Sequence, residues 1–286
     1  MMTSLKNIAA LLTCHNRREK TLLCLKNLYD CRLPEGFLLD VFLVDDGSTD
    51  GTSDAVRDRF PSVNIISGAG DLFWNRGMHL AWTEAAKKDY DYYLWINDDT
   101  FLYPNAISEL IECSKQENDQ KICCGSTCAV SDKNKITYGG RITKKGKELI
   151  PNGQRQKCDY FNGNLVLIPK SVYALLGPND PHYRHAVGDY EYGLRAARNG
   201  IESVVAPYVS GECDEHESLS GWCNPQVPML KRLKLLYSPL GNHPIEFFRF
   251  ENMHYGLRSA CFHFITNHLR AICPYMWGQN INKLSI

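Results

Sequence analysis

The sequence predicts an α/β protein with a Rossmann-like, mostly parallel central sheet flanked by helices. Short apolar runs of strand length alternate with segments of helical periodicity over the first hundred residues. Polar residues follow each of the first four runs, at 13–17, 45–46, 68–77 and 97–99. Because the carboxyl ends of parallel strands meet at one edge of a sheet, we expect these four segments to form a single ligand site.

The first half of the chain is expected to form four strand–helix units. Each expected strand is a short apolar run, and each expected helix has apolar residues three or four positions apart. Gly47 and Gly51, with Ser48, Thr49 and Asp50 between them, indicate a tight turn and an N-cap before the second helix. The expected strands are 8–12, 38–44, 63–66 and 92–96, and the expected helices are 19–30, one through Ala55 and Phe60, 78–88 and 104–113.

The second half is less regular. The segment 185–200 is typical of a capped helix, because glycines begin and end it, acids lie in its first turn and arginines in its last. We also expect short strands and a surface hairpin over 121–157, with basic residues at 144–147 in a solvated turn, a buried strand at 165–169, a helix at 170–176 and a strand at 201–206.

Residues 225–286 are expected to form a helical appendage to a main domain over 1–224. The chain has no net charge, which argues against a dedicated nucleic-acid binder, but this region carries seven Lys or Arg and two Glu. We expect its helices to pack on the main domain, and the alternative is a basic amphipathic surface that docks on a membrane. One helical stripe consists of Leu257, Cys261, Phe264, Ile265, Leu269 and Ile272.

The chain shows no export signal and no membrane span. Its N-terminal residues lack the extended apolar run of a signal peptide, and no stretch reaches the roughly 18 apolar residues that cross a bilayer. The twelve cysteines lack the paired spacing of a zinc site and are expected to be reduced thiols. We therefore expect a cytoplasmic protein.

The apolar run at 92–96 ends in Asn97, Asp98 and Asp99. Two adjacent carboxylates repel each other, so a partly buried pair favours a cation such as Mg²⁺ or Mn²⁺. Taken alone, the same residues are equally consistent with a capped turn after a strand.

Four short motifs, in their order and spacing, resemble the family 2 glycosyltransferases, bacterial surface-polysaccharide type. The resemblance covers about 5–210. It implies the GT-A fold, with a nucleotide-binding half over about 1–100 and an acceptor-binding half over about 101–224. The motifs are Thr13-Cys14-His15-Asn16-Arg17, Val44-Asp45-Asp46-Gly47-Ser48-Thr49-Asp50-Gly51-Thr52, Asn97-Asp98-Asp99, and Gly188-Asp189-Tyr190-Glu191 followed by Leu194-Arg195.

The resemblance implies inverting transfer of a hexosyl or rhamnosyl group from a UDP- or dTDP-sugar. Asp99 would hold Mn²⁺ or Mg²⁺ with help from Asp98, because Asn97 replaces the first acid of the family's metal motif. A divalent ion there neutralises charge on the leaving diphosphate. The implied nucleotide contacts are Thr13, Asn16, Arg17, Asp45, Asp46, Arg76 and Asp98.

The resemblance also implies that Asp189 is the general base, since an attacking hydroxyl must lose its proton as the new bond forms. The implied acceptor is a glycan or lipid-linked glycan at the inner face of the membrane, where the basic C-terminal region would make peripheral contact. Glu191, Asn164 and Trp74 are expected as acceptor or secondary contacts, and His216 as either a metal ligand or part of a solvated turn.

Two other functions are compatible with parts of this pattern. A sugar-nucleotide nucleotidyltransferase shares the Rossmann-like half, but it requires a glycine-rich loop after the first strand, and the chain has no glycine before Gly36. A catalytically inactive sugar-nucleotide-binding module would be expected to lose its acids, yet Asp46, Asp98, Asp99 and Asp189 are all present.

Overall fold

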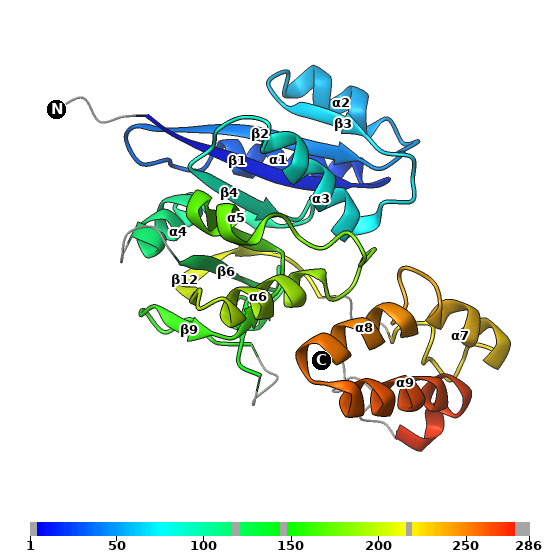
Figure 1. Ribbon diagram of the computed structural model, residues 1–286. Helices are drawn as coiled ribbons and strands as arrows, with labels where there is room; N and C mark the ends of the chain where they lie inside the picture. Colours follow the sequence, from blue (N-terminus) through cyan, green and yellow to red (C-terminus); the bar gives the residue numbers. More distant parts are fainter. Residues whose placement is uncertain (1–4, 116–120, 144–147, 216–218, 278–286) are drawn as a thin grey trace.

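The computed structural model describes residues 5–115, 121–143, 148–215 and 219–277 (Figure 1). In chain order the elements of the main domain are β1 (Lys6–Cys14), α1 (Arg18–Tyr29), β2 (Phe37–Asp45), α2 (Thr52–Arg59), β3 (Asn64–Ser67), α3 (Phe73–Ala85), β4 (Tyr92–Ile96), β5 (Phe101–Leu102), α4 (Ala106–Lys115), β6 (Ile122–Cys128), β7 (Ile136–Tyr138), β8 (Gly140–Arg141), β9 (Gln156–Cys158), β10 (Tyr160–Phe161), β11 (Leu165–Pro169), α5 (Lys170–Leu176), α6 (Gly188–Arg198) and β12 (Ser203–Glu212). The appendage comprises α7 (Met229–Leu236), α8 (Pro244–His254), α9 (Leu257–Ile272) and the 3-10 helix η1 (Pro274–Trp277).

One large sheet has the strand order β3-β2-β1-β4-β11-β6-β12-β5. β1, β2, β3 and β4 pair in parallel, and so do β6 and β12. β11 runs antiparallel between β4 and β6, so the expected parallel sheet is confirmed with one reversed strand at its centre. The sequence did not show this reversal, because a short apolar run is compatible with either direction.

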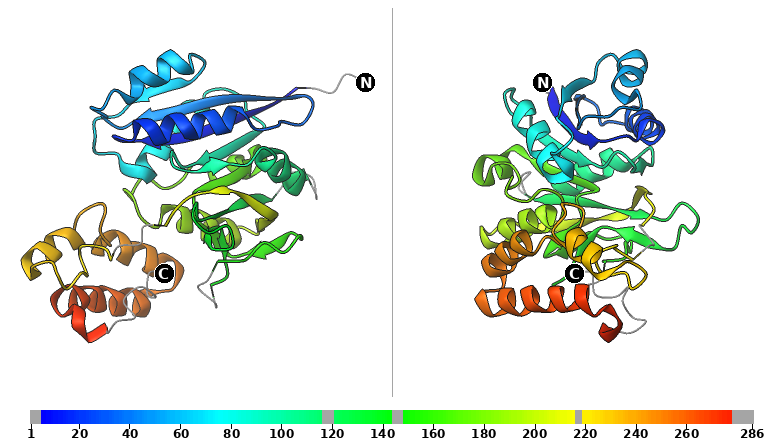
Figure 2. Two further views of the ribbon diagram at one scale, coloured as in Figure 1. Left: turned by 180° about the vertical axis from the view of Figure 1, so that it is seen from behind. Right: turned by 90° about the vertical axis from the view of Figure 1, so that its right-hand side faces the viewer.

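Helices cover both faces of the sheet (Figures 1 and 2). One core lies under α1, α2 and α4 and includes Leu25, Val56 and Ile111. The other lies under α3, α5 and α6, where Trp82 and Trp95 are fully buried. The aromatic run of β4 is therefore scaffold for the segment that follows it.

The start of α3 differs from the expectation in a way that affects the site. α3 begins at Phe73, so that Trp74 to Gly77 lie on a helix rather than in a loop. The Asp46 carboxylate accepts hydrogen bonds from the Leu72 and Phe73 amides, a long-range cap that sequence spacing does not reveal. α6 begins at Gly188, the glycine expected at its start, and follows Val187 in a left-handed conformation with φ 59°.

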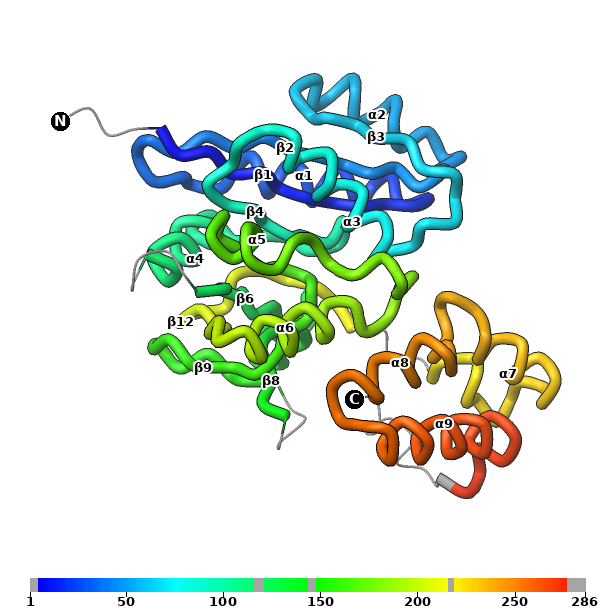
Figure 3. The backbone as a smooth tube through the Cα atoms, viewed as in Figure 1, coloured from blue at the N-terminus to red at the C-terminus, as the bar shows by residue number. Residues whose placement is uncertain are grey.

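The appendage packs beside the start of α6 (Figure 3). Phe247 and Phe250 of α8 form a small core with Tyr183 and Val187 of the main domain. Glu246 of α8 also pairs with Arg184 at 2.6 Å. α8 itself was not expected from the sequence, and the predicted stripe of α9 is mostly exposed rather than packed against the main domain.

None of the helices in the described ranges has the length and hydropathy to cross a membrane.

Candidate active site

A cavity of about 1620 Å³ opens where the predicted polar segments meet. Asp45 at the end of β2 lies opposite Cys14 of β1 and Ser67 of β3, so three strand ends share one edge. The segments after β1, β2 and β4 line one side of the cavity, α6 and the Asn162–Asn164 turn another, and α9 a third. This volume exceeds the roughly 300–1,000 Å³ of most small-ligand pockets.

Arg17 bridges the two acids that follow β4. Its guanidinium lies 2.9 Å from Asp98 Oδ1 and 2.8 Å from Asp99 Oδ2. Asp98 is buried and also accepts a 3.4 Å hydrogen bond from Thr21. Burial raises the pKa of Asp98 to about 6, although Arg17 opposes this shift. Asp99 lines the cavity with Asp98 and Arg17, and its Oδ1 accepts a 3.7 Å bond from the Cys213 thiol.

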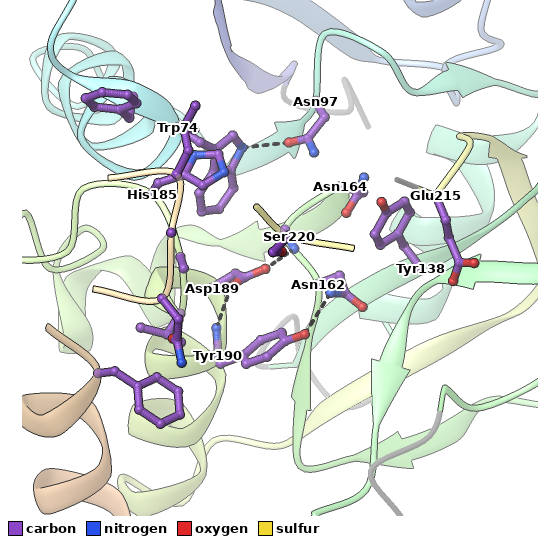
Figure 4. A pocket seen from close by; sticks show the side chains of 18 of the residues that line it. Trp74, Asn97, Tyr138, Asn162, Asn164, His185, Asp189, Tyr190, Glu215 and Ser220 are labelled. Carbon is purple, nitrogen blue, oxygen red and sulfur yellow. Dashed lines mark hydrogen bonds between the residues drawn. The ribbon is translucent and has the colours of Figure 1, made fainter. Parts of the chain in front are cut away.

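Asn97 has a structural partner that accounts for its amide. Its Oδ1 accepts a 2.6 Å hydrogen bond from Trp74 Nε1 (Figure 4). An amide makes this bond without adding a third negative charge beside Asp98 and Asp99. Trp74 in turn packs edge-to-face on Trp95, and a side chain at Gly163 would collide with its ring. Trp74 therefore lines the cavity in a fixed orientation.

Adjacent Asp45 and Asp46 have different surroundings. Asp45 accepts hydrogen bonds from Ser48 and Ser53 within its own turn and is absent from the cavity lining. Asp46 lines the cavity, and its carboxylate accepts the amides of Gly70, Leu72 and Phe73 at 2.8 to 3.0 Å. It thus organises the loop that leads into α3.

Thr13 lines the cavity and packs against Gly77 of α3, where a side chain would overlap it. Asn16 does not line the cavity. It has φ 50° and its Oδ1 accepts the Thr49 amide, so it links the loops after β1 and β2.

Arg76 also lies outside the cavity lining, with its Nε donating to the Pro181 carbonyl at 2.9 Å. The neighbouring Asn75 is fully buried and donates to the carbonyls of Asp180 and Tyr183. Gly188 lies so close to Asn75 Oδ1 that a Cβ would overlap it. The Asn75-Arg76-Gly77 segment therefore holds the chain that precedes α6.

Asp189 lies in the first turn of α6 and faces the cavity (Figure 4). Its Oδ2 accepts the Gly163 amide at 2.8 Å, and its Oδ1 accepts its neighbour Tyr190's amide at 2.9 Å. Burial raises the pKa of Asp189 to about 6, while these two amides oppose the shift. The carboxylate is thus fixed in orientation and largely ionised at neutral pH.

Of the three residues expected as secondary contacts, two line the cavity and one does not. Glu191 is buried, pairs with Arg195 at 3.0 Å and does not line the cavity. Asn164 does line it and donates to Cys213 Sγ at 3.5 Å, and Trp74 lines it too. His216 lies outside the described residues.

Sequence reasoning missed several cavity residues near α6 and the Asn162–Asn164 turn. Arg141 donates to Asn162 at 3.3 Å, pairs with Glu148 and lies 6.0 Å from the Tyr190 ring centroid. Asn162 also donates to Tyr190 Oη at 3.1 Å (Figure 4). The Asn162-Gly163-Asn164 turn was the available signal, whereas nothing near Arg141 in the sequence distinguishes it.

The donor set around Asp99 fits a divalent ion that a substrate helps to bind. No three His, Cys, Asp or Glu side chains gather into a closed metal site in the part of the chain that the structure describes. Mg²⁺ and Mn²⁺ commonly take one or two carboxylates and complete their shell with phosphate oxygens and water. Asp99 lines the cavity and meets that requirement. Arg17 binds both acids, and Asp98 differs from Asp99 in being the more buried and in accepting a further hydrogen bond from Thr21.

A family model described as Glycosyl transferase family 2 matches residues 10–177, which is more than half of the chain. The chain belongs to this family. The match includes the segments of Thr13, Asp46, Asp99 and Asn164 and ends before Asp189. A comparison with curated protein sequences gave no match.

Solved structures of glycosyltransferases share the fold. The mannosyltransferase PcManGT from Pyrobaculum calidifontis, in complex with GDP-Man and Mn²⁺, has a TM-score of 0.57 at 15% identity, over 96% of this chain and 76% of that chain. TarS 1–349 from S. aureus, in complex with UDP-GlcNAc, has a TM-score of 0.59 at 11% identity, over 96% of this chain and 92% of that chain. The GT-A fold expected from the sequence is confirmed, and the protein is a glycosyltransferase of that type.

Proposed function

We propose that this glycosyltransferase inverts the anomeric centre of a nucleoside-diphosphate sugar and transfers the sugar to a hydroxyl of a glycan or lipid-linked glycan. The observation that carries the proposal is that Asp99 and Asp189, on different elements, line one cavity. In this proposal Asp99 would hold the metal ion that binds the diphosphate and Asp189 would act as the general base, both within the space where a donor and an acceptor would meet.

The donor would lie against the segments after β1, β2 and β4. Arg17 supplies a cation to the diphosphate, and Thr13 and Asp46 line the nucleotide end. A Mn²⁺ or Mg²⁺ ion held by Asp99 would stabilise the negative charge of the departing nucleoside diphosphate. PcManGT with GDP-Man and Mn²⁺, and TarS with UDP-GlcNAc, support a nucleotide-sugar donor. We propose a UDP- or dTDP-sugar with a hexosyl or rhamnosyl group.

Transfer would be a single displacement. The acceptor hydroxyl attacks the anomeric carbon on the face opposite the diphosphate, and the bond to the diphosphate breaks with its electron pair moving to the phosphate oxygen. Asp189 takes the hydroxyl proton as the new bond forms. The Gly163 and Tyr190 amides hold both carboxylate oxygens, which keeps the base oriented before the acceptor arrives.

The cellular role follows from the acceptor. We propose that the enzyme acts in surface-polysaccharide biosynthesis at the cytoplasmic face of a membrane, in peripheral contact through its C-terminal region. Nucleotidyl transfer is set aside, because the loop after β1 contains Asn16 and Arg17 in place of glycines.

Calorimetric titration with UDP, dTDP and GDP, each with and without Mn²⁺, tests the donor site. We expect one nucleotide to bind in a Mn²⁺-dependent way, and Asp99→Asn to remove that dependence. Asp58→Asn, on the exposed face of α2, is the matched control.

Asp189→Asn should lower kcat by roughly 10²- to 10⁴-fold with nucleotide affinity unchanged. The proposal fails if no nucleoside diphosphate binds, or if Asp189→Asn transfers sugar at the normal rate.

A further inference from the structure

α9 presents an apolar face to solvent. Seven of its residues are exposed, and six of these are apolar. At 100° per residue all seven fall within an arc of about 140°. A helix of a globular protein normally buries such a stripe, so a continuous exposed one indicates an interaction surface. The six residues, called the α9 surface below, are Leu257, Cys261, Phe262, Ile265, Leu269 and Ile272.

The exposed charges of the appendage are all positive within residues 219–277. They belong to Lys231, Lys234, Arg249 and Arg258, and Arg258 lies within the arc of the α9 surface. Both acids of this region are turned inward. Glu246 pairs with Arg184, and Glu251 is buried against His263 at 3.1 Å.

This combination favours an anionic lipid surface. Arg258 lies within the apolar arc, and the other exposed charges of the appendage are Lys231 and Lys234 of α7 and Arg249, which pairs with Asp180 at 3.5 Å. An apolar helix face on a basic region of this kind is typical of helices that lie in the headgroup region of a membrane. A second copy of the chain on the same surface would bring like charges together, which opposes a symmetric dimer.

The α9 surface adjoins the cavity. The next face of the same helix lines the cavity through His263, Thr266, Asn267 and Arg270. Phe262 belongs to both, since it lines the cavity and is 62% exposed. Leu240, before α8, also lines the cavity and is 67% exposed. A flat surface in contact with α9 would therefore lie at the mouth of the cavity.

We propose that the α9 surface docks the protein on an anionic lipid bilayer, so that the cavity opens at the membrane. The acceptor would then be a molecule anchored in that bilayer, a statement that rests on the proposed glycosyl transfer. Docking itself does not depend on the chemistry and is measured separately.

Flotation of the full-length chain with phosphatidylcholine vesicles, with and without phosphatidylglycerol, tests the docking. We expect binding to the anionic vesicles that weakens as salt is added. Ile265→Glu should lower the partition coefficient by about tenfold or more, because it places a charge within the apolar contact. Leu175→Glu is the matched control, since Leu175 on α5 is 63% exposed and Ile265 is 58% exposed.

A probe in the α9 surface gives a second measurement. Cys261 and Cys273 are exposed and the other ten cysteines are buried, so Cys273→Ser leaves Cys261 for a fluorescent label. Spin-labelled lipid should quench this label. It should leave unquenched a label at Leu175→Cys in a chain whose Cys261 and Cys273 are both replaced by Ser. Equal flotation of Ile265→Glu and the unchanged chain, or no quenching at Cys261, would overturn the proposal. Self-association or binding of an acidic protein that Ile265→Glu abolishes, without vesicle binding, would also overturn it.

Nucleotide titration on the same samples separates the two proposals. Flotation without nucleotide binding contradicts only the proposed transfer, and Mn²⁺-dependent nucleotide binding without flotation contradicts only the docking.

Discussion

Acidic residues that are neighbours in this sequence have separate tasks in the structure. Asp46 faces the cavity and orders a loop, while Asp45 stabilises its own turn. Asp189 faces the cavity, while Glu191, two positions along α6, is buried against Arg195. The surroundings of each carboxylate, rather than its residue type, thus decide which acids are available for chemistry.

Activity should depend on pH through Asp189. Burial raises the pKa of Asp189 to about 6, and only the ionised form accepts a proton. We therefore expect kcat/KM to fall as the pH decreases through about 6 and to be level above about 7. Initial rates measured across this range, with the pH stability of the protein checked in parallel, test the sign.

The matched variant for this profile is Asp189→Asn. Its residual activity should lose the acid limb while the Mn²⁺-dependent nucleotide affinity stays unchanged. An acid limb that persists in Asp189→Asn would assign the titration to another group, such as Asp98, whose pKa is also raised to about 6.

For individual residues, the sequence was sufficient to predict most of the acidic residues that line the cavity, but not the hydrogen-bond partners of the site residues. Asp46, Asp98, Asp99 and Asp189 were expected at the site and do line one cavity. The Trp74–Asn97 hydrogen bond joins residues 23 positions apart, and no local pattern marks it. Arg76 was expected to contact the nucleotide, yet it donates to Pro181, far along the chain.

At the scale of elements, α3 and the start of α6 are packed without space for an added atom. Asn75 Nδ2 donates to the carbonyls of Asp180 and Tyr183, and Asn75 accepts from Asn179. His79, one turn further along α3, bonds to the Asn179 carbonyl at 2.7 Å. Together these contacts fix the loop that leads to Asp189.

Gly188→Ala should therefore destabilise the protein by about 1–3 kcal/mol, because its methyl group would overlap Asn75 Oδ1. Asn75→Ala alone should cost a similar amount, since it leaves buried carbonyls without donors. In the double variant the overlap is gone, so the combined loss should be smaller than the sum of the two. Urea denaturation of the four proteins gives this coupling, and simple additivity would contradict the predicted contact.

Periodicity located most helices and strands of the main domain, and it failed where long-range contacts set a boundary or a direction. α5 was expected at its observed residues, and β4 likewise. The start of α3 depends on Asp46, and the direction of β11 depends on its two neighbours in the sheet. Neither fact is encoded in a local spacing of apolar residues.

At the scale of the whole molecule, the cavity has room for two ligands together. Its volume of about 1620 Å³ is more than one small-molecule site requires. Its walls come from the segments after β1, β2 and β4, from α6 and from α9. A direct displacement likewise needs the donor and the acceptor bound at the same time.

Steady-state kinetics should therefore follow a sequential mechanism. Double-reciprocal plots at several fixed acceptor concentrations should intersect, and the nucleoside diphosphate product should compete with the donor. Parallel lines would indicate a covalent sugar–enzyme intermediate and contradict the single displacement.

The packing of the C-terminal appendage on the main domain could be predicted only in part from the sequence. Its helical stripe was evident from the spacing of Leu257, Ile265 and Leu269, whereas the side of the helix that faces the main domain was not. The structure turns this stripe to solvent and uses α8 for the packing contact. Periodicity identifies an apolar face and says nothing about what that face meets.

The hydrogen bonds between α3 and the loop before α6 bear on chimeras in which the C-terminal segment of the protein is replaced. Asp189 follows a segment that hydrogen-bonds to Asn75, Arg76 and His79, all on α3. The same segment is also held by α8, because Glu246 pairs with Arg184, and Phe247 and Phe250 pack on Tyr183 and Val187. Chimeras that replace residues 225–286 should therefore keep the proposed displacement chemistry only where the incoming segment supplies these α8 contacts.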